Sequence, residues 1–381
     1  KPSRLYFASQ RVWKSDDRGD SWNPISKDLT RNQERFDLPI MGSKQSWDNP
    51  WDVLAMSNYN TISAISESPV REGLIYAGTD DGFINVTDND GKRWKKFEVK
   101  RLPGAPEYAY VNDLKADNFD ENTVYAVLDN HKYGDYKPYV YKSTNKGQTW
   151  KSIVSNLPQK SHSWRIVQDH VKKDLLFLGT EFGVYFSVNG GEIWTKLTGN
   201  VPTIPFRDLA IHKRENDLVG ATFGRGFYIF DDMSVFRSIS EDQMKSKATL
   251  FPVRKALWYI PRSFLGGSGK ASQGDGYYIA PNPPFGAVFT YHISEPYQTK
   301  AEKRRERETK SSKTIGFPGW NEVEAERREH KPKIIFEIKD SDGNVVRRLE
   351  GAASKGFHRI AWDLRYPTPY ALPLDRDKAS G

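Results

Sequence analysis

The sequence predicts an all-β protein built from repeated antiparallel sheets, and three observations support this fold class. The 381-residue chain is rich in aromatic residues, with 11 Trp, 19 Tyr and 20 Phe, and it also holds 29 Gly and 22 Pro. Its apolar residues fall in short β-prone runs that are separated by turn residues. An octapeptide that ends in Trp recurs along the first two-thirds of the chain. We therefore expect strands and tight turns over most of the chain.

The octapeptide follows the pattern Ser/Thr-x-Asp/Asn-x-Gly-x-x-Trp. Its copies end at Trp22, Trp94, Trp150 and Trp194, at intervals of 72, 56 and 44 residues, and the last interval is close to one four-stranded propeller blade. The Asp or Asn can bond backbone N–H groups, the Gly accepts a positive φ, and the Trp can pack over the turn. The residues expected to build these turns are Ser15, Asp17, Gly19, Trp22, Thr87, Asn89, Gly91, Trp94, Ser143, Asn145, Gly147, Trp150, Ser187, Asn189, Gly191 and Trp194.

Predicted strands surround each octapeptide. Pairs of apolar runs joined by a turn cover residues 74–86, 124–142, 175–186 and 218–230, the last of these without an octapeptide. One further run precedes each pair, at residues 62–66, 111–116, 164–168 and 206–211. A complete copy is therefore predicted as three strands, the octapeptide turn and a fourth strand. A first copy begins at Leu5 and lacks its innermost strand.

The octapeptide resembles the Asp-box, also called the bacterial neuraminidase (BNR) repeat, and the hairpins around it look like blades of Asp-box β-propellers. That family includes sialidases, oligoxyloglucan hydrolases, sortilin-type receptors and a photosystem assembly factor. The chain is similar to large exported bacterial repeat proteins described as sortilin-like or glycosyl-hydrolase-like. The resemblance implies a β-propeller that functions outside the cytoplasm, in the periplasm, at the cell surface or secreted. It does not by itself imply a function, because the family spans enzymes and binding proteins.

The number of copies predicts a partial propeller. About four to five blades are recognisable, fewer than the closed propellers of the family contain, and an open ring leaves sheet edges unpaired. We therefore expect this chain to be the C-terminal part of a larger propeller, whose missing blades belong to the same parent chain.

Composition predicts three regions along the chain. They are the propeller blades at 1–232, an exit strand and a Gly/Pro-rich linker at 233–284, and an immunoglobulin- or fibronectin-like β-sandwich at 285–381 with a charged insertion at 299–330. The expected strands of the last region cover residues 287–293, 333–339, 344–349 and 356–364. That number is short of the roughly seven strands of such a sandwich.

Charge and cysteine content exclude several classes of protein. Lys and Arg number 57 and Asp and Glu 49, a net charge of +8 with both signs interspersed, which argues against a nucleic-acid binder. The charged run at residues 300–313 is predicted as a solvated insertion, the alternative being a contact with an anionic surface such as an acidic glycan. The absence of Cys excludes disulfides and thiolate metal sites. No apolar run is long enough for a membrane span.

The sequence predicts no metal site built on histidine and no cofactor. The seven histidines are scattered and none shows a tight ligand spacing. Structural calcium stays open, because Asp117, Asp120 and Glu121 crowd one loop, although ordinary turn hydrogen bonding explains the same residues.

Two functions remain open. The favoured one is an exported bacterial binding or scaffold protein that holds a protein or glycan partner on its loop face, with expected binding residues Trp47, Trp51, His131, Tyr133, Tyr136, Trp164 and Arg225. These loops could instead pack on one another or on the missing blades. The alternative is a glycoside hydrolase of the oligoxyloglucan-hydrolase-like type, which needs paired carboxyl groups. Its candidate catalytic residues are Asp80, Asp81 and Glu181, although each also fits a polar hairpin tip.

Overall fold

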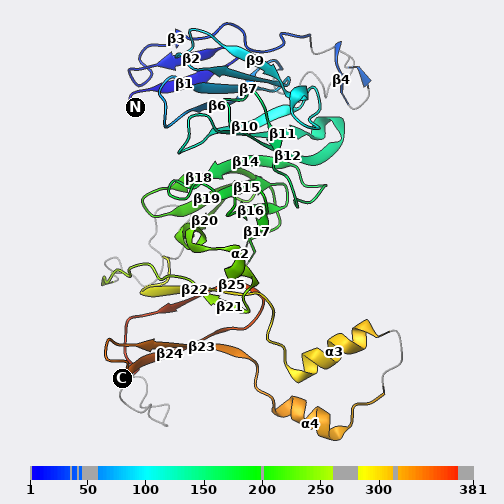
Figure 1. The fold of residues 1–381 in the computed structure, drawn as a ribbon, viewed down its shortest axis with the longest axis vertical. Coiled ribbons are helices and arrows are strands. Elements are labelled where there is room, and N and C mark those ends of the chain that lie inside the picture. Colours follow the sequence, from blue (N-terminus) through cyan, green and yellow to red (C-terminus); the bar gives the residue numbers. More distant parts are fainter. Residues whose placement is uncertain are drawn as a thin grey trace, which may run out of the picture. The chain divides into compact units, whose positions relative to one another are not determined.

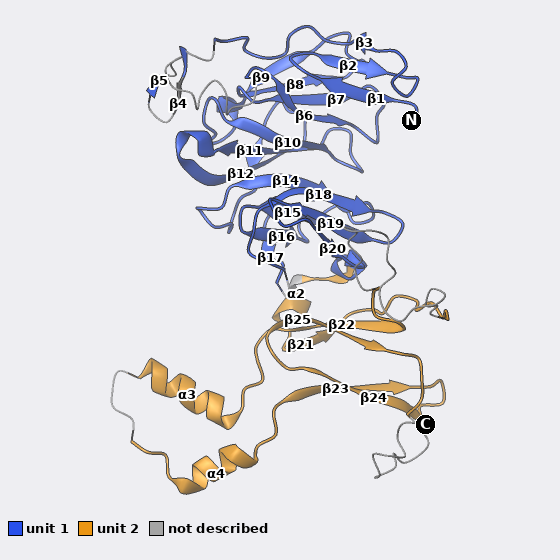
Figure 2. Cartoon of the chain, turned by 180° about the vertical axis from the view of Figure 1, so that it is seen from behind, with its two compact units in different colours: residues 1–237 blue, residues 238–381 orange. Residues whose placement is uncertain are grey.

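The computed structural model describes residues 2–34, 37–40, 43–44, 59–198, 201–260, 282–311 and 316–367. The chain divides into two compact units, residues 1–237 and residues 238–381 (Figure 2). Strands dominate the first unit, and the described α-helices lie in the second (Figure 1). Among the described residues, no helix is long and apolar enough to cross a membrane.

The first unit is a series of antiparallel sheets that follow one another along the chain. Three of them have four strands. Their strands are β6 (Ile62–Glu67), β7 (Ile75–Thr79), β8 (Phe83–Thr87) and β9 (Lys95–Glu98); β10 (Tyr110–Ala116), β11 (Val124–Asn130), β12 (Asp135–Ser143) and β13 (Lys151–Ser152); and β14 (Ser163–Gln168), β15 (Leu176–Thr180), β16 (Gly183–Ser187) and β17 (Thr195–Lys196).

A three-stranded sheet flanks this series at each end. One contains β1 (Leu5–Ala8), β2 (Val12–Ser15) and β3 (Asn23–Pro24), and the other contains β18 (Phe206–His212), β19 (Asp217–Thr222) and β20 (Phe227–Phe230). The other elements among the described residues are the short pair β4 (Pro39–Ile40) and β5 (Ser43–Lys44) and the 3-10 helices η2 (Val99–Arg101), η3 (His131–Tyr133) and η4 (Met233–Ser238).

The sheets are arranged as propeller blades. The first strand of each four-stranded sheet contacts the first strand of the next, so that β6, β10, β14 and β18 lie in sequence along the inner side. Within each sheet, consecutive strands pair antiparallel. The predicted all-β fold and the predicted partial propeller are confirmed, and the strands coincide with the predicted apolar runs.

Apolar cores lie between consecutive sheets. In β11, Ala126 and Leu128 pack toward the preceding sheet, whereas Tyr125 and Val127 pack toward the following one. Successive side chains of a strand point to opposite faces, and both faces of this strand are covered, so all of its residues are buried. This explains why the inner strands read as continuous apolar runs rather than alternating ones.

The octapeptide turns share one hydrogen-bond pattern. In the third copy the Ser143 hydroxyl donates to Asn145 Oδ1 (3.0 Å) and accepts from the backbone N–H of Gly147 (2.9 Å), while Asn145 Oδ1 also accepts from Thr149 N (2.9 Å). The other three copies repeat these bonds at equivalent positions. The recurring Ser/Thr and Asp/Asn therefore satisfy the backbone of a turn that has no strand partner.

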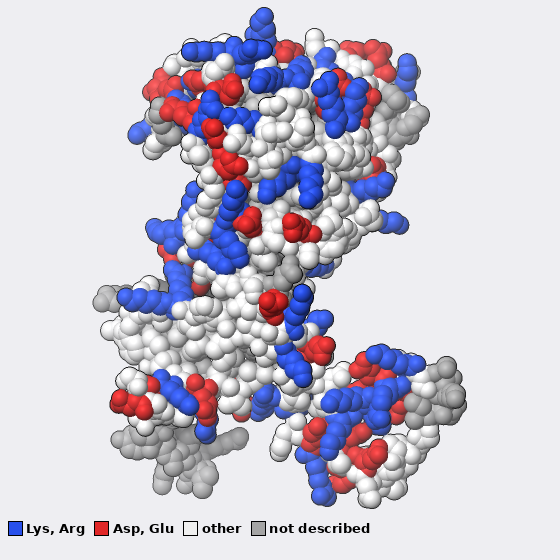
Figure 3. Space-filling view, in the orientation of Figure 1, with Lys and Arg blue, Asp and Glu red and all other residues white. Residues whose placement is uncertain are grey.

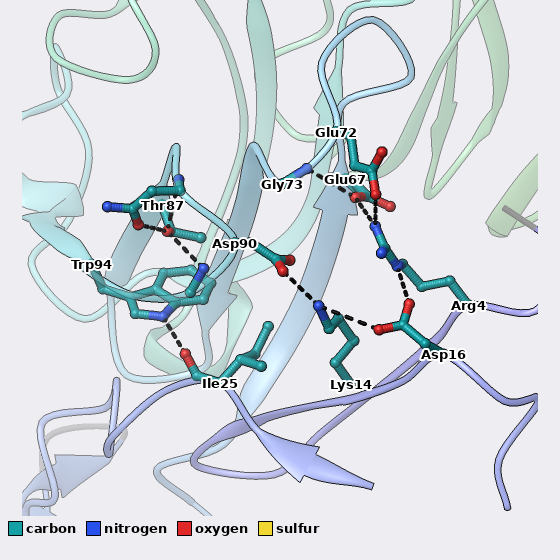
Figure 4. A network of polar contacts seen from close by, with 12 residues as sticks. Arg4, Lys14, Asp16, Ile25, Glu67, Glu72, Gly73, Thr87, Asp90 and Trp94 are labelled. Atoms are coloured by element: carbon teal, nitrogen blue, oxygen red, sulfur yellow. Dashed lines mark hydrogen bonds and ion pairs between the residues drawn. The ribbon is translucent and has the colours of Figure 1, made fainter. Parts of the chain in front are cut away.

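The octapeptide also ties neighbouring sheets together. Trp94 Nε1 donates at 2.9 Å to the carbonyl of Ile25, the residue that follows the last strand of the preceding sheet (Figure 4). Nearby, Lys14 reaches Asp90 of the second octapeptide at 2.6 Å, and Arg4 pairs with Asp16 at 2.7 Å. Trp194 repeats the first contact, because its Nε1 donates to the carbonyl of Ile153 at 2.7 Å. Trp94 and Trp194 thus link blades as well as forming part of a turn, whereas Trp150 Nε1 donates to the carbonyl of Gly147 within its own turn at 3.0 Å.

We expect Trp194→Phe to destabilise the first unit by about 2–3 kcal/mol, because the change leaves the buried Ile153 carbonyl without its donor and removes buried ring volume. Chemical denaturation followed by far-UV circular dichroism measures the loss. The matched control is Trp22→Phe, since Trp22 has the same place in the first octapeptide and is 39% exposed. Equal losses for the two variants would contradict a link between blades at Trp194.

The second unit contains two small sheets and two charged helices. One sheet pairs β21 (Ala248–Leu250), β22 (Ala287–Ile293) and β25 (Gly356–Trp362), and the other pairs β23 (Lys333–Lys339) and β24 (Val345–Ala352). Phe289 and Tyr291 of β22 pack against Phe336 of β23, so the two sheets share a core. An immunoglobulin-like sandwich stays a prediction for this unit.

The predicted exit strand and the charged insertion both contain regular secondary structure. The predicted exit strand pairs with β22, so β21 belongs to a sheet of the second unit. The charged insertion forms α3 (Lys300–Lys310) and α4 (Trp320–Arg328), joined by Arg304, which reaches Glu326 at 2.8 Å. Both signs of charge are mixed over these helices (Figure 3), which favours a solvated face over a basic patch. A short helix, α2 (Glu241–Lys245), precedes β21.

Candidate functional site

A polar and aromatic cluster lies at one edge of the first unit, which we call the His–Trp cluster. It contains Asp129, His131, Tyr136, His162, Trp164, Glu181 and Arg207. In an antiparallel blade the first strand begins, the second ends and the third begins at the same edge. The cluster residues occupy these positions in three consecutive sheets, which is why segments distant in sequence meet there.

Four aromatic rings form the centre of the cluster. The imidazoles of His131 and His162 stack with centroids 5.4 Å apart, and His162 contacts Trp164 edge to face at 4.6 Å. Tyr136 lies 6.1 Å from His162. The guanidinium of Arg207 covers Trp164 at 3.4 Å from the ring centroid, a cation–π contact. Trp164 is therefore enclosed, with 7% of its surface exposed.

Two carboxylates hold the imidazoles in place. Asp129 accepts from the backbone N–H of His131 at 3.0 Å and contacts Nδ1 of the same ring. Glu181 accepts from Trp164 Nε1 at 3.0 Å and lies 3.3 Å from Nε2 of His162. Burial lowers the pKa of His162, although both carboxylates favour its charged form. His162 is therefore predominantly neutral at pH 7.

Three exposed aromatic rings lie at the same edge as the cluster, and one of them, Tyr136, belongs to it. Tyr136 is 50% exposed, Phe182 46% and Phe223 68%. Each belongs to the hairpin between the second and third strands of its sheet, and the three sheets are consecutive. Arg207 also lies 5.1 Å from the Phe223 ring, which connects this rim to the cluster.

Some of the predicted binding residues meet in the cluster and others do not. His131, Tyr136 and Trp164 converge in the cluster, whereas Tyr133 is half-buried and Arg225 is exposed in the turn between β19 and β20. Trp47 and Trp51 lie outside the described residues.

Other residues of the site were not among the predicted binding residues, namely Asp129, His162, Phe182, Arg207 and Phe223. Their positions in the sequence could have indicated them, because each lies at a strand end or hairpin tip of the same edge.

Two of the three candidate catalytic carboxylates have structural roles. Asp80 is 6% exposed and accepts from the backbone and hydroxyl of Thr61 at 2.8 and 2.9 Å. Asp81 is fully buried and accepts from Arg31 N at 2.6 Å and from the Thr79 hydroxyl. Both side chains fasten the β7–β8 hairpin to neighbouring segments. Glu181, by contrast, keeps a quarter of its side chain exposed.

Asp80 makes the stability of the first unit depend on pH. Burial raises its pKa to about 6, despite the hydrogen bonds from Thr61. A raised pKa means that the folded state binds the proton more tightly, so this stabilisation is complete below about pH 4 and is lost as the pH rises through 6. We expect Asp80→Asn to remove a decline of up to about 3 kcal/mol between pH 4 and 7. If the unfolding free energies of the variant and of the unaltered chain changed in parallel with pH, the proposed effect of Asp80 would be contradicted.

The predicted calcium ligands are engaged with protein donors. Asp117 accepts from the backbone of Phe119 (2.8 Å) and from Gln168 Nε2 (2.8 Å). Asp120 accepts from the Thr123 hydroxyl at 2.7 Å, and Glu121 pairs with Arg71 at 3.2 Å. The three carboxylates therefore stabilise turns and a surface ion pair, and calcium binding by them is still only a hypothesis.

Comparison with known proteins gives a distant likeness. No family model matches this chain. The xyloglucanase Xgh74A of Acetivibrio thermocellus is 26% identical over 205 residues, which cover 49% of this chain and 23% of that enzyme. The chain thus spans about a quarter of the length of the curated relative.

Solved structures add a likeness of fold alone. The GH74 xyloglucanase from Xanthomonas campestris shares 17% identity with a TM-score of 0.44, over 60% of this chain and 34% of that one. An ancestral GH74 enzyme shares 19% identity with a TM-score of 0.42, over 58% of this chain and 26% of that one. The blade arrangement of the first unit rests on its own sheet topology and strand contacts.

Proposed function

We propose that the first unit is a glycan-binding section of a larger bacterial scaffold propeller that works outside the cytoplasm. The observation that carries the proposal is the rim of three exposed aromatic rings at the edge that holds the His–Trp cluster. Sugar rings present apolar C–H faces and hydroxyl edges, so their recognition needs flat apolar surfaces beside hydrogen-bonding groups. Tyr136, Phe182 and Phe223 supply the surfaces, while Glu181 and the imidazoles supply the polar groups.

Xyloglucan oligosaccharides are the probe, because the curated relative is a xyloglucanase. We expect calorimetric binding by the full chain, weakened at least about tenfold by Tyr136→Ala and by Phe223→Ala. The matched control is Phe119→Ala, which removes a ring of 40% exposure at the opposite edge, between β10 and β11. Absence of binding, or equal weakening by the control, would count against glycan recognition at this rim.

A glycoside hydrolase is the second candidate, and the similarity to a xyloglucanase favours it. Because Asp80 and Asp81 are buried in structural contacts, Glu181 is the candidate carboxylate that a substrate could reach. Hydrolysis requires a second carboxyl about 5–10 Å away. Release of reducing ends from xyloglucan that Glu181→Gln abolishes would establish this activity, whereas binding without turnover supports the scaffold.

The end faces of the blade series support the scaffold part of the proposal. Strands β7, β8, β15 and β16 are buried on both faces. The equivalent β1 and β20 expose alternate residues, with Phe7 61% and Phe227 75% exposed. The corresponding faces of the inner sheets are covered by neighbouring blades. We therefore propose that further propeller blades cover the exposed faces of β1 and β20. Phe227→Glu should then leave the isolated chain stable but prevent its association with a fragment that carries those blades.

A further inference from the structure

The His–Trp cluster brings together three side chains that can each bind a metal ion. Asp129, His131 and His162 each offer one ligand atom, and these atoms all lie within 4.8 Å of one another. Asp129 and His131 come from the end of β11 and the start of η3, whereas His162 precedes β14 in the next sheet. The spacing of these residues in the sequence does not indicate a metal site, because the three candidate ligands meet only through the packing of two blades.

The distances suit a small divalent ion. Three atoms within 4.8 Å of one another lie at most about 2.8 Å from a common point, and zinc binds nitrogen and oxygen at about 2.0–2.2 Å. A contraction of under about 1 Å per ligand, within the reach of side-chain rotation, would form the site. The arrangement leaves a further coordination position free, as in zinc sites that bind a water or a substrate group.

The surroundings of the three ligands also favour a cation. Asp129 is 3% exposed and already contacts Nδ1 of His131, so two ligand atoms are adjacent before an ion binds. Glu181 lies 3.3 Å from Nε2 of His162 and is itself held by Trp164 Nε1. A carboxylate on a metal-binding imidazole fixes the orientation of the ring. Within the cluster the two carboxylates face one guanidinium, that of Arg207.

We propose that Asp129, His131 and His162 form a binding site for a divalent transition-metal ion, with Glu181 as a positioning residue. Imidazole nitrogen combined with carboxylate oxygen is the ligand set of zinc and related ions rather than of calcium or magnesium. The site goes beyond the proposed glycan binding, and it can be tested without a glycan.

The test is titration of the full chain, first freed of metal with EDTA, with Zn²⁺ in a calorimeter. We expect one Zn²⁺ per chain, and affinity reduced more than about 100-fold by His131→Ala and by His162→Ala. Glu181→Gln should weaken binding by about tenfold, because it acts through His162. Substitution with Co²⁺ should give the visible absorption of a four- or five-coordinate ion, and this absorption should disappear in both His variants.

The matched control is His212→Ala, since His212 is an exposed histidine on β18 outside the cluster. This variant should bind Zn²⁺ like the unaltered chain. Thermal unfolding in EDTA checks the fold of each variant, and His131→Ala is the milder change because 37% of that side chain is exposed. Absence of stoichiometric Zn²⁺ binding, or binding that both His variants retain, would overturn the proposal and leave the Asp129–His131 contact as a hydrogen bond only.

Discussion

Replacing Gly91 with Ala is expected to destabilise the first unit by about 3–4 kcal/mol. Gly91 has a φ of +84° in the second octapeptide, where an L side chain costs about 1–2 kcal/mol. A Cβ at this position would also lie 2.5 Å from the carbonyl oxygen of Ile25, which directly follows the preceding sheet. That overlap is with backbone, so it forces the two sheets apart at an added cost of about 1–3 kcal/mol.

Gly147→Ala separates the two causes. Gly147 has the same octapeptide position and a φ of +80°, but a Cβ there would lie 3.4 Å from the Trp150 ring, an ordinary contact. This variant should lose only the conformational part, about 1–2 kcal/mol. The free energies of unfolding from urea titration give the comparison. If the two variants lost the same amount, the close approach of Gly91 to the preceding blade would have no energetic weight.

Removing the carboxylate of Asp169 is expected to cost about 3–5 kcal/mol. Its side chain is fully buried and accepts two bonds from the guanidinium of Arg237, both at 2.9 Å. It also accepts from the backbone N–H groups of Val171 (3.0 Å) and Lys172 (2.7 Å). Asp169→Ala therefore leaves a largely buried cation without its carboxylate partner, although Arg237 still donates to Asn216 Oδ1, and it leaves two backbone N–H groups without their acceptor.

The loss at Asp169 should depend on pH. Burial opposes its charge, but the hydrogen bonds from Arg237 and the backbone outweigh burial and hold its pKa below the ordinary value. A lowered pKa contributes stability above the unfolded-state value of about 3.9, and that contribution is lost as the pH falls through the folded-state value. The difference between Asp169→Ala and the unaltered chain should therefore shrink in acid.

A surface pair provides the control for Asp169. Glu121 pairs with Arg71 at 3.2 Å, and both side chains are about 40% exposed. Glu121→Ala should cost under about 1 kcal/mol, because an exposed pair is solvated in either state. A loss at Asp169 no larger than this, or one independent of pH, would show that the buried pair does not hold η4 against the fourth sheet.

Much of the first unit could be predicted from local sequence, because its turns are stabilised by hydrogen bonds between residues close in the chain. The turn from Ser143 to Trp150 closes on itself through its own hydroxyl, amide and glycine. The continuous apolar run of β11 follows from coverage on both faces. The second unit was harder to predict, because β21 finds its partner, β22, only across a long stretch of chain.

The roles of the residues at the candidate site depend on packing that the sequence does not show. Glu181 and Asp80 occupy equivalent hairpins and looked alike as acidic hairpin tips. Only packing separates them, since Asp80 is buried against Thr61 whereas Glu181 stays partly exposed beside His162. Likewise Trp164 was expected on an accessible face, and Arg207 covers it.

The repeat, the turns and the strand order follow from local sequence, because they depend on contacts between residues close in the chain. The tertiary structure alone decided which side chains meet at the blade edge. His131 and His162 lie in different blades and come together only when the cores between the sheets form. The same packing buries some carboxylates in structural bonds and leaves others beside imidazoles. The arrangement of the candidate site therefore depends on the packing of neighbouring blades rather than on any motif within one of them.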